Sequence, residues 1–399
     1  MTPSHRRDQA RDENRAIAQR CGKILLLVTE DWFALSHFKP LIATLRDIAD
    51  EVVIATRSSG RFRELESLGA RVVPFDFRRS SLSPFEQTGT IRKLARLIRD
   101  EKPDVTHVVA MQPMVLASMA LRLAPGCRVV MHLTGLGFLG ISEGLAARVI
   151  RPLAFAALRG ILNRDNAWLI AENPDDRDYL TENGILLGNR STILGGAGID
   201  ASAFPALLQP QSRPVSAAFV GRLIRSKGIE VLAEAARYLH DSKHDLDLKL
   251  YGKIDADNPD AIKSSQLDGW QRDGLLDWRG HVADVREVWA DTHICVLPAI
   301  TREGMPRALL EAAASARPLI VTDVPGCRHF VRDGIEGRVV PPGDAKALAH
   351  ALAELTSDHA LRAEMGMAAR ARVLHGFTLA HVQAGIRRAY AGLLEQRTL

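Results

Sequence analysis

Residues 215–239, VSAAFVGRLIRSKGIEVLAEAARYL, join a short apolar segment to a helical pattern through a basic loop. The run of small and apolar residues at its start is typical of a buried parallel strand, and the apolar residues after the loop recur at helical spacing. The basic loop, residues 221–228, contains two glycines and several cations. A strand that leads directly into a helix in this way indicates a parallel sheet covered by helices.

The same alternation occurs twice along the chain. In the first half, the apolar segments KILLLV, EVVIAT and ARVVPF alternate with helical patterns, and VTHVVA, CRVVMHL and AWLIA continue the series. The series restarts after LLQPQSRP, which has the composition of a linker. We therefore predict an α/β protein of two doubly wound, Rossmann-like domains facing across a cleft, with ligands bound beyond the carboxyl ends of the strands.

The breaks in this pattern give the expected domain boundaries. Residues 1–20 are polar and are expected to form a mobile tail. An N-terminal domain is expected over residues 21–205, and a C-terminal domain over residues 206–377. Residues 378–399 are expected to form a helix that packs back on the N-terminal domain.

Composition and length suit an ordinary globular protein. The chain has 399 residues, of which 46% are hydrophobic and 25% charged. No apolar segment approaches the roughly 18 to 20 residues that a spanning helix needs, so the protein is not expected to cross a membrane by itself. The four cysteines are far apart and show no CxxC spacing, which predicts reduced thiols and a cytoplasmic location.

Positive charge is concentrated in one part of the chain. Residues 78–164 contain thirteen Arg or Lys residues against five Asp or Glu residues, a net +8. Such a stretch suits nucleic acid, anionic lipid or phosphorylated ligands. Nucleic acid is not expected, because aromatic residues that could stack on bases are only 5% of the chain. The segment from Arg148 to Arg159 fits either a membrane headgroup interface or a core helix with a solvated face.

Two segments that follow strands of the second half could bind a diphosphate. The first is the basic loop, where glycine allows close backbone approach and the side chains of Arg222 and Lys227 can form charge-assisted hydrogen bonds to phosphoryl oxygens. Taken alone, this loop would more readily be interpreted as a solvated basic surface. The second is REGMPRALLE, residues 302–311, where Pro306 is expected to be the first residue of a helix. Backbone N–H groups around Gly304 and Met305 would then form an anion site at the helix start.

Two glutamates flank this helix start. Glu303 precedes it and Glu311 lies within the helix, so an elongated ligand could place a hydroxyl-bearing ring near each carboxylate. For Glu311 the alternative is an ion pair with Arg307, four residues earlier, on a solvated helix face.

Three segments carry a family resemblance. FVGRLIRSKGIEVLAEA (219–235), EGMPRALLEAAASARPLIVTDVPG (303–326) and DGIEGRVVPPGD (333–344) closely resemble the retaining glycosyltransferases of family GT4, which have the GT-B fold. The resemblance covers nearly all of the chain after the tail. The segments TGLG and IAENPDDRDYL are similar to those of members that extend sugar chains on polyprenyl diphosphate carriers.

The resemblance implies roles for individual residues of the second domain. Arg222 and Lys227 would bind the donor diphosphate and stabilise the departing charge. Glu303 would hold the transferring sugar, and Glu311 the ribose. The further residues implied in donor binding are Gly221, Gly252, Gly280, His281, Val282, Gly304, Met305, Pro306 and Leu310.

The first domain carries a weaker signal in HLTGLGFLG, a glycine-containing loop after a strand. Many GT4 members have a histidine two residues after a strand-end threonine; here the threonine is Thr134, and the nearest histidine, His132, comes two residues before it. His132 could therefore be an ordinary strand histidine. The residues expected at the acceptor site or cleft are His132, Thr134, Gly135, Gly137 and Asn173.

The resemblance implies a retaining hexosyl- or N-acetylhexosaminyltransferase that uses a nucleoside-diphosphate sugar, with UDP preferred, and a lipid-linked glycan acceptor in bacterial surface or extracellular polysaccharide synthesis. It implies that the enzyme needs no cofactor and has no metal ligands. It also implies a cytoplasmic protein that could bind peripherally to the inner face of the membrane. Two alternatives remain open: a nucleotide-sugar epimerase on the same two-domain frame, or a non-catalytic sugar-nucleotide-binding subunit.

Overall fold

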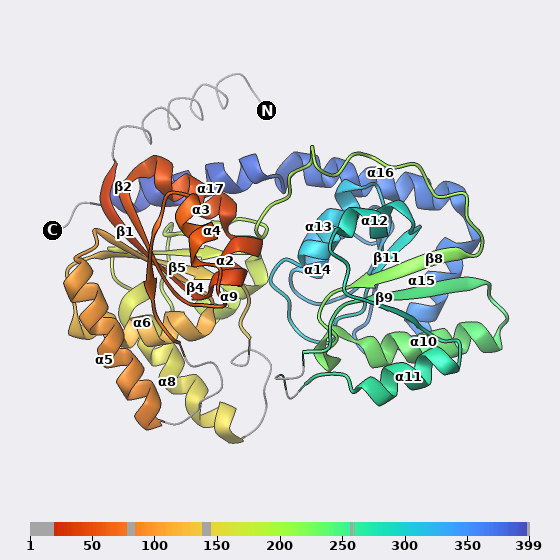
Figure 1. The fold of residues 1–399 in the computed structure, drawn as a ribbon, viewed down its shortest axis with the longest axis horizontal. Helices are drawn as coiled ribbons and strands as arrows, with labels where there is room; N and C mark the ends of the chain where they lie inside the picture. Colours follow the sequence, from red (N-terminus) through yellow and green to blue (C-terminus); the bar gives the residue numbers. More distant parts are fainter. Residues whose placement is uncertain (1–19, 78–83, 138–144, 256–257, 259, 397–399) are drawn as a thin grey trace. The chain divides into compact units, whose positions relative to one another are not determined.

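The chain folds into two compact units in the computed structural model, which describes residues 20–77, 84–137, 145–255, 258 and 260–396 (Figure 1). The first unit comprises residues 1–197 and 379–399, and the second comprises residues 198–378. The tail expected over residues 1–20 lies, except for Arg20, outside the described residues.

The first unit contains a seven-stranded parallel sheet with the strand order β3-β2-β1-β4-β5-β6-β7. Both faces of the sheet are covered, so the inner strands β4 and β6 are buried at every residue and not at every second one. The strands are β1 (Cys21–Glu30), β2 (Ala49–Arg57), β3 (Arg71–Pro74), β4 (Val105–Val109), β5 (Arg128–Leu133), β6 (Ala167–Ala171) and β7 (Ser191–Ile193).

Alternate side chains of β1 show how the two cores form. Leu25 and Leu27 contribute to one core, whereas Ile24, Leu26 and Val28 contribute to the other. The first core is covered by α5 (Pro84–Glu101), α6 (Met111–Leu123), α8 (Leu145–Leu162) and α9 (Pro174–Glu182). The second is covered by α2 (Asp31–His37), α3 (Lys39–Ile48), α4 (Phe62–Ser67) and α17 (Leu379–Glu395) (Figure 1).

The boundary between the units differs from the expected one. The first unit ends at residue 197 and not at residue 205. The reason is that Ile199 forms a β-bridge with Thr378, and Phe204 packs in the core of the second unit. At the other end of the chain, Tyr390 and Leu393 of α17 are buried in the first unit.

The second unit contains a six-stranded parallel sheet with the order β10-β9-β8-β11-β12-β13. Because β8 pairs with β11, the loops that follow these two strands lie at the same edge of the sheet. The strands are β8 (Val215–Val220), β9 (Leu246–Tyr251), β10 (Asp277–Gly280), β11 (Ile294–Leu297), β12 (Leu319–Thr322) and β13 (Gly337–Val340).

The helices of the second unit surround this sheet and bury one continuous apolar core. A short 3₁₀ turn, η1 (Arg225–Lys227), precedes α10 (Ile229–Asp241). The others are α11 (Ser264–Arg272), α12 (Val285–Ala290), α13 (Arg307–Ala314), α14 (Cys327–Phe330), α15 (Ala345–Ser357) and α16 (His359–Gly376). No helix in the described part of the chain is long and apolar enough to span a bilayer. All four cysteines are buried with free thiols.

Two buried histidines connect the first sheet to α17. His107 Nδ1 is 2.9 Å from the Tyr390 hydroxyl, and His107 Nε2 is 3.3 Å from His132 Nδ1. The edge of Phe38 packs against His132, with ring centroids 5.6 Å apart. Burial lowers the pKa of His132 to about 3, and burial together with the neighbouring His132 lowers the pKa of His107 well below its usual value. Both rings are therefore neutral in the folded protein.

We expect this pair to make the first unit less stable in acid. Each histidine has a pKa near 6.5 when unfolded, so below that pH the unfolded chain binds protons that the fold does not. The contribution of the two neutral histidines to the free energy of unfolding should be complete above pH 6.5. As the pH falls towards 3, this free energy should decrease by at most about 1.4 kcal/mol per pH unit for each histidine. Urea unfolding at pH 7.5, 6.5 and 5.5 measures this loss.

The control for this experiment is His132→Gln, which keeps a polar side chain near His107 but cannot titrate. Its free energy of unfolding should depend less steeply on pH than that of the wild type. Equal dependence in the two proteins would show that His132 contributes nothing to acid sensitivity.

Candidate functional site

The loops after β8 and β11 bring two charged side chains into direct contact. Lys227 Nζ lies 2.7 Å from Glu303 Oε1 and donates a hydrogen bond of 2.8 Å to Oε2. The two side chains are 76 residues apart in the sequence and are 16% and 15% exposed. An ammonium group and a carboxylate therefore lie side by side, largely shielded from water, at the carboxyl edge of the sheet.

Two glycines allow the loops to approach backbone to backbone. Gly228 has φ +75°, and a Cβ atom there would lie 1.8 Å from the carbonyl oxygen of Pro298. Gly326 has φ +80°, and a Cβ atom there would lie 1.7 Å from the carbonyl oxygen of Gly304. Any side chain at either position would separate the loops. The position of Glu303 thus depends on a glycine at position 326, which the sequence pattern alone did not connect to it.

Backbone hydrogen bonds hold the basic loop in place. Ile300 N–H donates to the Ser226 carbonyl (3.0 Å), which joins the loop after β11 to the 3₁₀ turn. Arg225 N–H donates to the Asp260 carbonyl (2.8 Å), and Ser226 N–H donates to Asp260 Oδ2 (3.1 Å). The turn that carries Lys227 is therefore fixed from two sides.

The other expected cation, Arg222, is much more exposed. Its side chain is 61% exposed, and its Nη1 lies 3.5 Å from Asp255 Oδ2. Sequence reasoning did not identify Asp255 as a partner, because it lies 33 positions from Arg222, in the loop that follows the next strand, β9. Arg222 and Lys227 thus belong to one loop but differ in burial and in the carboxylate that each contacts.

The helix after Glu303 begins one residue later than expected. Pro306 has ψ 119°, an extended conformation, and precedes α13, which begins at Arg307. The expectation that Pro306 is the first helical residue is therefore wrong by one position, since its backbone is not yet helical. Met305 is 8% exposed and Leu310 is 1% exposed, and both contribute to the core that anchors this segment.

Glu311 is buried and paired at the same time. Its residue is 7% exposed, and Oε1 accepts a hydrogen bond of 2.7 Å from Arg307 Nε. Burial raises the pKa of Glu311, while the charge and hydrogen bond of Arg307 act in the opposite direction. The ion pair that the sequence offered as an alternative is thus present; its arginine is exposed to solvent, whereas its carboxylate is buried.

Three of the expected donor-binding glycines lie at neighbouring strand ends. Gly221 follows β8, Gly252 follows β9, and Gly280 ends β10. Gly252 N–H donates a hydrogen bond of 2.7 Å to the Gly280 carbonyl. Next to them His281 is exposed, whereas Val282 is partly buried against the core. These residues form a backbone-lined edge beside the basic loop.

The expected residues of the first unit lie at the ends of β5 and β6. His132 is only 3% exposed and points into the unit, in the histidine pair described above. Thr134 and Gly135 are half-buried and Gly137 is exposed. Asn173 is fully buried, and its side chain accepts a hydrogen bond of 2.9 Å from Asp176 N–H, which caps the start of α9.

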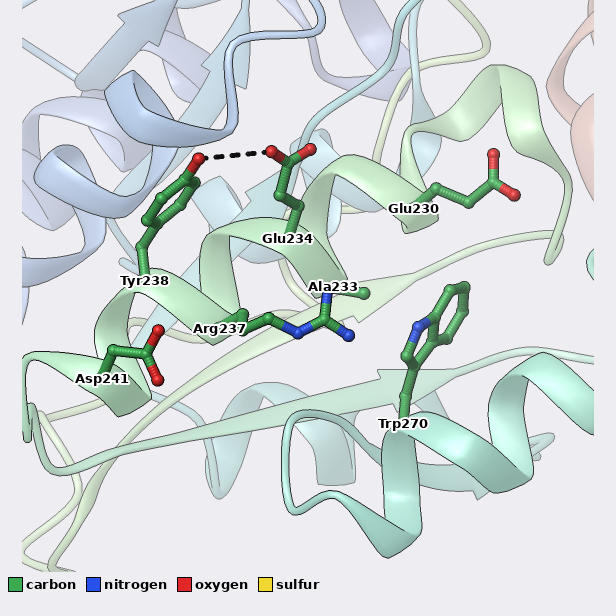
Figure 2. Close-up of a pocket in the computed structure, with 7 residues that line it drawn as sticks. All are labelled: Glu230, Ala233, Glu234, Arg237, Tyr238, Asp241 and Trp270. Carbon is green, nitrogen blue, oxygen red and sulfur yellow. Dashed lines mark hydrogen bonds between the residues drawn. The ribbon is translucent and has the colours of Figure 1, made fainter.

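A separate surface pocket of about 350 Å³ lies on α10 and α11 (Figure 2). It contains none of the expected site residues. The Tyr238 hydroxyl donates a hydrogen bond of 3.4 Å to Glu234 there. The lining residues are Glu230, Ala233, Glu234, Arg237, Tyr238, Asp241 and Trp270.

Family models match both units. A model described as "Glycosyl transferase 4-like" matches residues 23–164, and one described as "Glycosyl transferases group 1" matches residues 214–358. The second match includes the basic loop and both glutamates of the site.

Two similar proteins act on undecaprenol-linked sugars according to their names. The N,N'-diacetylbacillosaminyl-diphospho-undecaprenol alpha-1,3-N-acetylgalactosaminyltransferase of Campylobacter jejuni is 24% identical over 82% of this chain and 88% of its own. The UDP-Gal:alpha-D-GlcNAc-diphosphoundecaprenol alpha-1,3-galactosyltransferase of Escherichia coli is 24% identical over 79% of this chain and 81% of its own.

Solved structures share the fold. HepE of Anabaena, in complex with UDP and glucose, matches with a TM-score of 0.72 at 18% identity, over 91% of this chain and 97% of its own. The sucrose-phosphate synthase of Thermosynechococcus elongatus matches with a TM-score of 0.75 at 18% identity, over 94% of this chain and 99% of its own. With two parallel-sheet units, matching family models and these structural neighbours, the chain belongs to the glycosyltransferases of family GT4 and has the GT-B fold.

Proposed function

We propose that this glycosyltransferase transfers a hexosyl or N-acetylhexosaminyl group, with retention of configuration, from a nucleoside-diphosphate sugar to a glycan acceptor carried on polyprenyl diphosphate, in polysaccharide assembly. The observation that carries the proposal is the contact of Lys227 with Glu303 at the end of two adjacent strands. The names of the two undecaprenol-using relatives support the acceptor class, and the UDP complex of HepE supports UDP as the preferred nucleotide.

The chemistry follows from the charges at this edge. When the bond between the sugar and the diphosphate breaks, negative charge develops on the leaving oxygen. Lys227 and Arg222 would meet that charge, and because Lys227 is already fixed, little reorganisation is needed during the reaction. Glu303 would accept a hydrogen bond from a hydroxyl of the sugar. Its negative charge would also stabilise the positive charge that develops on the sugar ring. The acceptor hydroxyl would attack from the face that the diphosphate leaves, and its proton would pass to the departing phosphoryl oxygen.

Glu311 would bind the ribose. Its carboxylate is buried and oriented by Arg307, so its position is fixed before a ligand arrives. A vicinal diol can donate two hydrogen bonds to one carboxylate. Because the ribose is remote from the bond that breaks, this contact should contribute equally to ground-state and transition-state binding.

A basic surface of the first unit supports docking on an anionic membrane. Arg92, Lys93, Arg96 and Arg99 of α5 are all exposed, and none of the four forms an ion pair with another residue in the described ranges. On α8, Leu153 is 62% exposed between Arg148 and Arg159. Both α5 and α8 pack against α6, so they lie on the same face of the sheet (Figure 1). Cations beside an exposed leucine suit a lipid headgroup region.

The transferase proposal predicts release of nucleoside diphosphate only when donor and acceptor are both present. A panel of nucleotide sugars, each assayed with and without a polyprenyl-diphosphate-linked N-acetylhexosamine, identifies the donor.

Because Arg222 and Lys227 supply positive charge, activity should persist in excess EDTA. Activity that is lost in EDTA and restored by manganese would contradict this charge assignment, whereas epimerised donor without diphosphate release would favour the epimerase alternative.

The two glutamates should differ in their kinetic effects. Glu303→Ala should lower kcat by about 100- to 1000-fold, since it removes a contact made to the reacting sugar. Glu311→Ala should raise the donor KM by about 10- to 100-fold with kcat nearly unchanged. Steady-state kinetics with varied donor measure both, with Glu311→Gln as the isosteric control. The same kinetic profile for both alanine variants would refute the assignment.

The basic surface should give charge-dependent membrane binding. Each cation near an anionic surface contributes about 1 kcal/mol, so replacing the four α5 cations with Gln should abolish sedimentation with vesicles that contain anionic lipid. Wild-type binding should increase with anionic lipid and decrease with salt. The control carries the same charge change on exposed residues of the second unit: Arg237, Lys243, Lys263 and Arg272. Equal loss of vesicle binding in both variants would show that the cations of α5 have no specific role in membrane binding.

A further inference from the structure

The carboxyl ends of β1 and β2 present an arginine whose position is fixed by a buried carboxylate. Glu30 and Arg57 are paired in the register of the two strands. Arg57 Nη2 lies 2.6 Å from Glu30 Oε1, and Nε donates a hydrogen bond of 3.0 Å to Oε2. The Glu30 side chain is 3% exposed, but that of Arg57 is 53% exposed. The guanidinium is thus held by two contacts to one carboxylate, and about half of the Arg57 side chain is exposed to solvent.

The next residue fixes the neighbouring loop. Asp31 is fully buried and accepts hydrogen bonds from Ser59 N–H (2.8 Å), Ser59 Oγ (2.5 Å), Arg61 N–H (3.0 Å) and Trp32 N–H (2.7 Å). Burial opposes its ionisation, but these hydrogen bonds outweigh burial and hold the pKa of Asp31 below its usual value. The loop after β2 and the start of α2 therefore form one rigid edge.

Trp32 stands at this edge with much of its indole in solvent. It is 40% exposed, whereas Trp168, in the same unit, is 7% exposed. Phe33 supports the ring from one side, with centroids 5.9 Å apart. Part of the Trp32 indole is therefore accessible to a ligand, whereas that of Trp168 is not. An exposed aromatic ring and a fixed polar group at the carboxyl ends of adjacent strands are usual components of a small-ligand site.

The topology favours a ligand at this place. In the order β3-β2-β1-β4-β5-β6-β7, the chain order reverses at β1, which has β2 on one side and β4 on the other. Ligands of open parallel sheets bind beyond the carboxyl ends of the strands at such a reversal. Trp32 and Arg57 follow the two strands on one side of it.

We propose that Trp32 and Arg57 form the binding site for the sugar-diphosphate head of the acceptor. The indole face packs against the apolar face of the acceptor sugar, and the Arg57 guanidinium donates hydrogen bonds to phosphoryl oxygens. This inference rests on the proposed function and assigns acceptor recognition within it to two residues that no sequence motif marked.

The test uses the full-length protein and a short-chain polyprenyl-diphosphate-linked N-acetylhexosamine in detergent. Trp32→Ala should raise the acceptor KM roughly tenfold and leave the donor KM unchanged, while Trp32→Phe should restore most of the acceptor affinity. Arg57→Lys keeps a cation opposite Glu30 but cannot reproduce the planar two-pronged contact, so it should also raise the acceptor KM. The matched control is Tyr238→Ala, which removes a 37% exposed aromatic residue from the pocket in Figure 2 and should change neither KM.

A binding measurement separates this inference from the proposed function. Titration of the same probe without donor should change the tryptophan fluorescence of the wild type, and Trp32→Phe should abolish that change. If the wild type transfers no sugar from any donor, the proposed function fails, and the titration alone then decides the inference. An unchanged acceptor KM in Trp32→Ala, or a fluorescence change that persists in Trp32→Phe, would overturn the assignment.

Discussion

The close approach of two backbone loops in the second unit is the constraint on which its site depends. Gly228 packs directly against the Pro298 carbonyl, and Gly326 packs directly against the Gly304 carbonyl. The loops after β8, β11 and β12 are therefore packed at these points without intervening side chains. This packing sets the separation of Lys227 and Glu303. The ion pair is therefore a result of backbone packing, and its geometry does not rely on the small net energy that an ion pair supplies once its desolvation is counted.

The two units use one topology and a similar electrostatic arrangement. In both sheets the order reverses at the first strand of the unit, β1 or β8. At each reversal a cation is held by a shielded carboxylate: Arg57 by Glu30, and Lys227 by Glu303. A cation fixed in this way keeps its position while no ligand is bound, which reduces the entropy lost when an anionic ligand arrives.

Sequence reasoning identified the features that depend on local pattern. Continuous apolar segments located the strands, and the basic loop with its glutamates predicted the candidate site. It could not determine features that depend on distant contacts. The burial of Glu311 depends on the core around α13, and the partnership of Arg222 with Asp255 depends on an irregular loop. Trp32, which we propose as an acceptor contact, carries no such pattern, because a single exposed aromatic has no periodicity and its exposure is visible only once the helix is placed on the sheet.

The discontinuity of the first unit has a consequence for synthesis on the ribosome. Its core is completed by α17, which packs against α3, β6 and β7 and whose Tyr390 contacts His107, 283 positions earlier in the chain. Residues 198–378 form a self-contained unit inserted between these parts. The inserted unit can bury its own core as soon as it has been translated. The first unit emerges earlier but must wait with an apolar face of its sheet incompletely covered. During that interval we expect chaperones to bind the exposed apolar surface of the first unit, even though most of this unit is synthesised first.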